Sequence, residues 1–101
     1  MTDNELKISV EDRDLISVFM YGMTGLYSRT ITWNDLMPVL EKINHLGVPN
    51  VSISIHQFKT SYVTENSTVI DYYHKQYGGS IGATYNAVIS FLKWFNSQSK
   101  S

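Results

Sequence analysis

Apolar residues recur at helical spacing in the first half of the chain, and polar residues mark where each helix begins. A first helix is predicted over residues 10–21, since Ser9 precedes acidic residues at capping-box spacing and Gly22 interrupts the pattern. A second helix is predicted after Thr32, which has Asp35 as its capping partner. Its apolar face comprises Trp33, Leu36, Met37, Leu40 and Ile43.

The last predicted helix, over residues 80–97, is apolar on a large part of its circumference. One stripe consists of Ile81, Tyr85, Val88, Ile89, Leu92 and Phe95, and a second consists of Ala87, Phe91 and Trp94. We expect the first stripe to lie on the sheet. The second stripe is either covered by the two earlier helices or left bare as a surface for a partner, and the sequence leaves both open.

Alternating apolar and polar residues predict strands in the middle of the chain. Residues 51–55 alternate as a half-buried strand does, and the β-prone segments 58–64 and 68–74 flank a turn at residues 65–67. Such short connections indicate an antiparallel meander. The predicted fold class is therefore α+β, a three-stranded antiparallel meander covered by helices in the order α-α-β-β-β-α.

Length and composition indicate one domain over residues 1–101. The chain has 101 residues, of which 43% are hydrophobic, enough for a core, and 17% are charged, too few for a disordered chain. We expect residues 1–8 and 98–101 to be loose. The alternation of Leu6 and Ile8 would also suit a short edge strand.

The sequence has no feature that directs it to a membrane or a secretory route. It lacks a basic segment followed by an apolar run, and it lacks a stretch of roughly 20 apolar residues that could span a bilayer. Cysteine is absent, which fits a reducing compartment. We therefore expect a cytoplasmic protein with no membrane contact.

Two segments resemble a family of small phage proteins. They are residues 32–43 in the second predicted helix, with the motif Trp33-x-x-Leu36-Met37-Pro38, and residues 85–96 in the last, with the motif Lys93-Trp94-Phe95-Asn96. Together with residues 15–22 they resemble uncharacterised proteins of Bacteroidetes phages and prophages, which are similar in outline to phage sandwich domains, layered α/β units of unknown function. The resemblance implies a phage-associated protein in a bacterial host cell, and it implies no activity or catalytic residue.

Residue patterns for catalysis or metal binding are weak. The three histidines, His45, His56 and His74, have no local ligand spacing, although His56 and His74 could meet across the sheet with Asp71. No cysteine nucleophile and no Gly-x-Ser-x-Gly turn is present. We therefore expect no enzyme, no cofactor and no metal site.

Aromatic and basic residues in the predicted sheet support an alternative function. Stacking of single-stranded nucleic acid on an aromatic outer face would draw on Phe58, Tyr62, Tyr72 and Tyr73 with Lys59 and Lys75. Half of these side chains must face the core because successive residues of a strand point to opposite faces. The net charge of −1 argues against a protein that depends on phosphate contacts. Nucleic acid is therefore the alternative partner.

The favoured function is a non-enzymatic protein–protein interaction module. Tryptophan and other large aromatic residues are common anchors in interfaces, although they also pack in cores. The predicted partner-binding residues are Ala87, Phe91 and Trp94 of the second stripe, together with Trp33. The partner is an unknown protein or a second copy of the chain.

Overall fold

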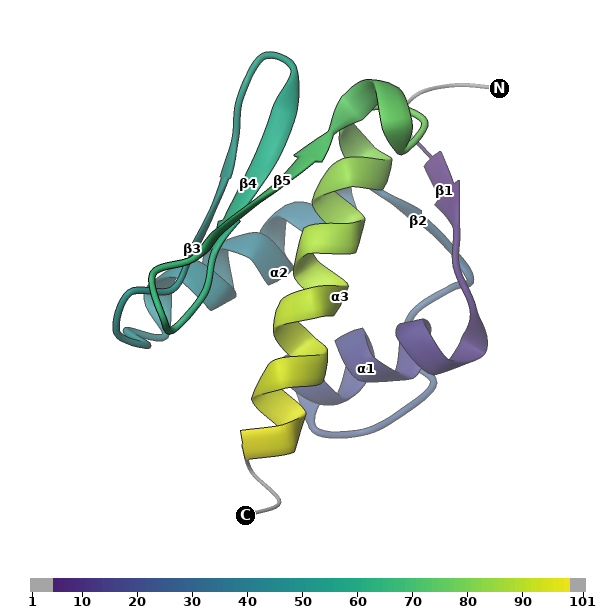
Figure 1. Cartoon of the computed structure of the whole chain (residues 1–101). Helices are drawn as coiled ribbons and strands as arrows, with labels where there is room; N and C mark the ends of the chain where they lie inside the picture. Colours follow the sequence, from purple (N-terminus) through teal and green to yellow (C-terminus); the bar gives the residue numbers. More distant parts are fainter. Residues whose placement is uncertain (1–4, 99–101) are drawn as a thin grey trace.

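The computed structural model describes residues 5–98 and contains, within them, α-helices and two antiparallel sheets (Figure 1). The elements in chain order are β1 (Glu5–Lys7), α1 (Val10–Tyr21), β2 (Thr30–Thr32), α2 (Trp33–His45), β3 (Ser52–Ile55), β4 (Lys59–Val63), β5 (Val69–Tyr73), the 3₁₀ turn η1 (His74–Gln76) and α3 (Ser80–Gln98). The predicted α+β class is confirmed. The expected loose ends at residues 1–4 and 99–101 lie outside the described residues.

The sheet formed by β1 and β2 corrects the predicted order α-α-β-β-β-α, because it places a strand before each of the first two helices. Leu6 pairs with Ile31, and the backbone N–H of Ile8 donates to the carbonyl of Arg29 at 2.7 Å. Burial of Ile8 and Ile31 in the core favours this pairing. Residues 5–8 therefore belong to the fold, as the edge-strand alternative predicts, and are not loose.

The second sheet is the antiparallel meander that the sequence predicts, with the strand order β3-β4-β5. Ile53 lies opposite Tyr62, which in turn lies opposite Ile70, so these residues share one face of the sheet. The turn between β4 and β5 falls at residues 65–67, as expected, and contains Ser67 with a positive φ of 64°. The sheet thus has an apolar inner face and a more polar outer face.

The predicted starts of α1 and α2 are confirmed by hydrogen bonds. The hydroxyl of Ser9 accepts from the backbone N–H of Asp12 at 3.1 Å, and the carboxylate of Asp35 accepts from the backbone N–H of Thr32 at 2.9 Å. Gly22 ends α1 in the left-handed region, with φ at 76°, where glycine is favoured. Local capping therefore sets where the chain leaves α1.

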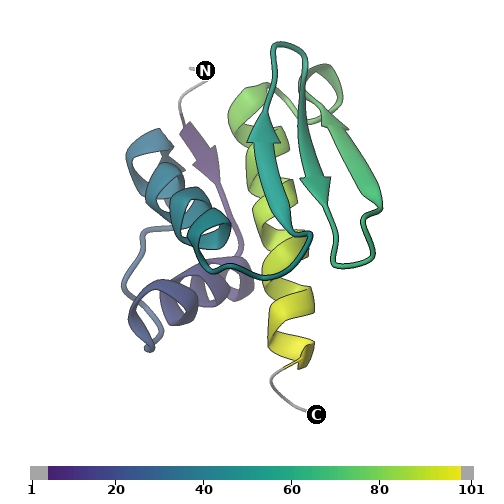
Figure 2. The same ribbon diagram turned by 90° about the vertical axis from the view of Figure 1, so that its left-hand side faces the viewer.

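The central element of the fold is α3, which lies between the three-stranded sheet and a layer formed by α1, α2 and β1 (Figures 1 and 2). On the sheet side, the hydroxyl of Thr84 lies 2.9 Å from that of Thr60 in a buried hydrogen bond. The ring of Phe91 meets that of Tyr62 edge-on, with 6.4 Å between centroids. Layers on two sides explain why α3 is apolar over so much of its surface.

Two residues of the first stripe of α3, which the sequence predicts to lie on the sheet, face α1 instead. The hydroxyl of Tyr85 donates to the carboxylate of Asp12, and the ring of Phe95 lies 5.8 Å from that of Phe19. The expectation is therefore wrong for Tyr85 and Phe95, and Phe91 of the second stripe contacts the sheet instead. Helical periodicity identifies two apolar stripes but not the layer that each one meets.

Candidate interaction surface

The second stripe of α3 is not the bare surface that the sequence allows. Ala87 and Phe91 are 0% exposed. The ring of Phe91 lies 6.1 Å from that of Phe19 on α1 and 6.4 Å from that of Tyr62 on β4. A side chain enclosed in this way has no surface to offer a partner, so the prediction of direct partner contacts by Ala87 and Phe91 is corrected, and both are core residues.

Trp94 and Trp33 are partly buried and occupy different parts of the molecule. Trp94 packs against Phe91, with 5.9 Å between the rings. Trp33 begins α2 and lines a small surface hollow with Glu5 and Thr32. The four predicted partner-binding residues therefore do not form one surface, and a partner contact by either tryptophan stays a prediction.

The outer face of the sheet holds only part of the aromatic set named for nucleic-acid stacking. Tyr62 and Tyr72 belong to the buried core, and the hydroxyl of Tyr72 lies 2.7 Å from that of Ser90 on α3. Of the predicted aromatic set, Phe58 and Tyr73 remain exposed. Half of the set thus faces the core, as strand alternation predicts.

Of the two lysines named for that face, Lys59 is already paired, and Lys75 lies beyond the sheet in η1. The carboxylate of Asp71 accepts from the hydroxyl of Ser61 at 2.7 Å and from the ammonium of Lys59 at 3.3 Å. The Ser61 hydroxyl, with help from Lys59, holds the pKa of Asp71 below its ordinary value. The charge of Lys59 is thus matched within the sheet rather than open to a phosphate.

The histidines of the sheet do not come together. His56 lies on the outer face, where its Nε2 is 2.9 Å from the hydroxyl of Ser54. The ring of His74 is directed to the other side, with Nε2 3.3 Å from the hydroxyl of Thr60. Among residues 5–98, no group of three or more His, Asp or Glu side chains is placed to hold a metal ion.

A groove of about 420 Å³ runs between α1 and α3, and its acidic side chains are largely engaged. Asp12 accepts a hydrogen bond from Tyr85, and burial, followed by the contact with Asp12, raises the pKa of that tyrosine. Asp14 accepts from the Nε of Arg13 at 3.3 Å. These carboxylates tie structural elements together, so the groove is a weaker candidate for binding than the loop beside it.

Exposed apolar side chains gather where α1 ends and the following loop begins. Tyr21, Met23 and Leu26 are 60%, 57% and 52% exposed, respectively. We call these three residues the loop surface. Exposed apolar area that is contiguous is a common mark of an interaction site, and these three side chains are candidates to contribute to one.

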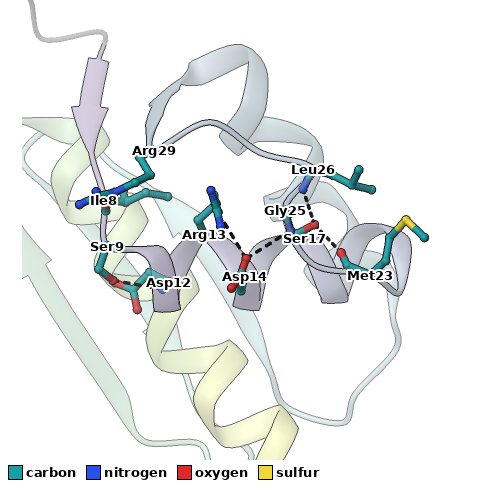
Figure 3. Close-up of polar contacts among 10 residues, drawn as sticks. All are labelled: Ile8, Ser9, Asp12, Arg13, Asp14, Ser17, Met23, Gly25, Leu26 and Arg29. Atoms are coloured by element: carbon teal, nitrogen blue, oxygen red, sulfur yellow. Dashed lines mark hydrogen bonds and ion pairs between the residues drawn. The ribbon is translucent and has the colours of Figure 1, made fainter.

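The loop that carries this surface is fastened to α1 by one buried hydroxyl. Ser17 is 0% exposed, and its Oγ donates to the carbonyl of Met23 and accepts from the backbone N–H of Leu26 at 3.1 Å. Figure 3 shows the side chains of Met23 and Leu26 directed away from Ser17. The backbone is therefore held while the apolar side chains face outward.

A second side chain of α1 holds the middle of the loop. The carboxylate of Asp14 accepts from the backbone N–H of Gly25 at 3.2 Å, as Figure 3 also shows. Gly25 has a φ of 80°, a conformation that L-residues with a side chain rarely adopt. The ring of Tyr27 lies 5.8 Å from that of Tyr21, which joins the far end of the loop to α1.

Sequence reasoning missed this site, although two signals were present. Ser17 interrupts the apolar run Leu15-Ile16 to Val18-Phe19 in α1, and glycine occurs at residues 22 and 25. A serine within a buried helical stretch needs a hydrogen-bond partner, and a neighbouring loop with glycines can provide one. Periodicity alone treats such a serine as a neutral position.

No protein-family model matches the chain, and no curated protein or solved structure shows a significant match. The resemblance to phage proteins therefore stays a prediction. Among residues 5–98, no helix has the length and apolar character that crossing a membrane requires. The fold and the loop surface thus define a small α+β protein whose function must be inferred from its own residues.

Proposed function

We propose that the protein is a non-enzymatic interaction module that binds a protein partner through the loop surface. The observation that carries the proposal is the fully buried hydroxyl of Ser17, which bonds to the backbone at Met23 and Leu26 while both side chains remain more than half exposed. Phage association and a cytoplasmic location stay predictions, and the proposal does not depend on them.

The energetics of a loop that is held before binding favour a binding role. A buried hydroxyl is costly unless it is hydrogen-bonded, and both observed bonds of Ser17 go to the backbone of the loop in its observed path. Ordering a mobile side chain at an interface costs about 0.5–1.5 kcal/mol, and a loop held in advance reduces the ordering cost. Two apolar side chains on a loop whose backbone is held in this way are therefore suited to serve as anchors.

The proposal is tested by making the two anchors polar. We expect the double substitution Met23→Ser and Leu26→Ser to leave the fold intact, because both side chains are mostly exposed. It should abolish capture of a partner by the immobilised protein from a lysate of its source cells, or self-association in sedimentation. Phe58→Ser is the matched control, since Phe58 is exposed between β3 and β4, away from the loop after α1.

The outcomes separate clearly. Loss of binding in the double variant but not in Phe58→Ser supports the loop surface. Equal capture and equal sedimentation in the wild type and both variants would refute it. A wild-type chain that neither captures a partner nor self-associates would also count against the proposal.

A further inference from the structure

The two edges of the three-stranded sheet are treated differently by the rest of the molecule. At the β3 edge, the side-chain amide of Asn44 on α2 makes two bonds with the backbone of Ile53, one to the carbonyl and one from the N–H, both at 2.9 Å. Asn44 thus takes the place of a neighbouring strand at Ile53. Blocking of an exposed edge in this way is a known defence against unwanted pairing.

The β5 edge has no equivalent protection among the described residues. The hydrogen bond from His74 N–H to the Phe58 carbonyl, at 2.9 Å, sets which residues of β5 bond to β4. In an antiparallel pair, the backbone N–H and C=O groups of alternate residues point to the same side of the strand. Those of Ile70, Tyr72 and His74 therefore point to β4, whereas those of Asp71 and Tyr73 point away from the sheet. Figure 2 shows β5 (green) at the outer margin of the molecule, with no other element beyond it.

The side chains of β5 suit an added strand. Val69, Ile70 and Tyr73 are 57%, 38% and 44% exposed, and the strand contains neither proline nor lysine, the residues that commonly discourage edge pairing. Its single charged residue, Asp71, lies at the centre of the strand and is about one quarter exposed. An incoming strand would therefore meet a carboxylate flanked by apolar and aromatic side chains.

We propose that the free edge of β5 binds an extended segment of a partner protein by antiparallel strand addition, with a basic residue of that segment opposite Asp71. Strand addition to an open edge is a common mode of peptide recognition, in which main-chain bonds supply affinity and side chains supply specificity. The carboxylate of Asp71 uses one oxygen for Ser61 and the other for Lys59. Each carboxylate oxygen has a further acceptor position for an incoming cation.

Charge decides between a partner segment and a second copy of the chain. In a symmetric pair of β5 strands centred on Asp71, the two Asp71 carboxylates would lie directly opposite one another. Like charges at directly opposite positions are destabilising, whereas opposite charges are favourable. This register is therefore disfavoured for two copies of the chain, whereas a foreign segment with lysine or arginine at its centre brings opposite charges together.

The probe is the acetylated and amidated peptide Thr-Thr-Val-Ile-Lys-Ile-Tyr-Thr-Thr, and its twin carries Glu in place of Lys. Amide hydrogen exchange is followed residue by residue by NMR. In the free protein, the amides of Asp71 and Tyr73 should exchange fast, and those of Ile70 and Tyr72 slowly. The Lys peptide should slow the exchange of Asp71 and Tyr73 and leave Ile70 and Tyr72 little changed.

The role of Asp71 is tested by the ratio of the two peptide affinities. We expect the Lys peptide to bind about two- to fivefold tighter than the Glu peptide, as cross-strand charge pairs allow. Asp71→Asn should bring this ratio close to one, and the control Glu41→Gln, on the exposed part of α2, should leave it unchanged. An unchanged ratio in Asp71→Asn would overturn the assignment of Asp71.

Three results would overturn the strand addition itself. One is the absence of slowed exchange at Asp71 and Tyr73 at the highest soluble concentration of the Lys peptide. Another is that the Lys peptide slows amide exchange in other helices or strands and not in β5. The third is slowed exchange of Asp71 and Tyr73 without peptide that becomes stronger as the protein concentration rises. This result would show that a second copy of the chain binds the β5 edge. The Met23→Ser and Leu26→Ser variant should bind the peptide normally, so this test is independent of the loop surface.

Discussion

Removal of the Ser17 hydroxyl should weaken the fold and release the loop that carries Met23 and Leu26. In Ser17→Ala, two hydrogen bonds disappear, one to the Met23 carbonyl and one from the Leu26 N–H. A typical intramolecular hydrogen bond contributes about 0.5–1.5 kcal/mol, so the two together predict a loss of about 1–3 kcal/mol. The alanine methyl group occupies nearly the same space, so little of this loss comes from a cavity.

The loss is measured by urea unfolding, and its local origin by amide exchange at Leu26. The free loop backbone can bond to water because Met23 and Leu26 are exposed, which favours the lower half of the predicted range. Each 1 kcal/mol should lower the melting temperature of a domain of this size by about 4–8 °C. Exchange at Leu26 should accelerate in Ser17→Ala because its N–H loses its acceptor.

A matched serine provides the control. Ser54 is exposed on β3 and its hydroxyl lies beside His56, so Ser54→Ala should change the free energy of unfolding by less than about 0.5 kcal/mol. If Ser17→Ala changed the free energy of unfolding no more than Ser54→Ala, with unchanged exchange at Leu26, the loop would not depend on the buried hydroxyl. The loop surface would then not be held in place by Ser17.

Further predictions concern the core, the outer face of the sheet and the nucleic-acid alternative. Phe91→Ala should cost about 3–5 kcal/mol in the free energy of unfolding, because the ring is 0% exposed, and Trp94→Ala should cost less, because Trp94 is only partly buried. The lowered pKa of Asp71 contributes stability that is present above the pKa of an unfolded aspartate and lost as pH falls through the folded value. Asp71→Asn should therefore flatten the acid limb of the stability–pH curve, and an unaltered limb would contradict this. A gel shift at about 50 mM salt, where phosphate contacts are strong, should show no binding of single-stranded DNA or RNA, and binding that disappears with added salt would favour the alternative function.

Interactions between residues close in the chain were predictable from the sequence alone. The starts of α1 and α2 follow from Ser9 and Thr32, whose capping partners lie three residues further on. The β4–β5 hairpin follows from β-prone segments on either side of a turn. The physical reason is that caps and turns satisfy backbone groups with neighbours in sequence, so composition and spacing report them directly.

Pairings between distant segments were decided by the tertiary structure. The β1–β2 sheet joins strands of three residues that are separated by the whole of α1, so neither strand carries a strong local signal. Burial of Phe91 follows from the position of α3 between two layers, with Phe19 on one side and Tyr62 on the other. An apolar stripe indicates that a surface must be covered, and only the packing of the layers determines what covers it.

The candidate site depends on the tertiary structure in the same way. The sequence around Met23 and Leu26 indicates only a loop. The outward direction of their side chains results from the contacts of Ser17 and Asp14 with the loop backbone. The sequence alone shows that Ser17 is a polar residue within an apolar helical run and therefore needs a hydrogen-bond partner. The chain path determined its partners, because a hydrogen bond across a loop requires the two groups to meet in space, and spacing along the sequence does not specify where an irregular segment returns.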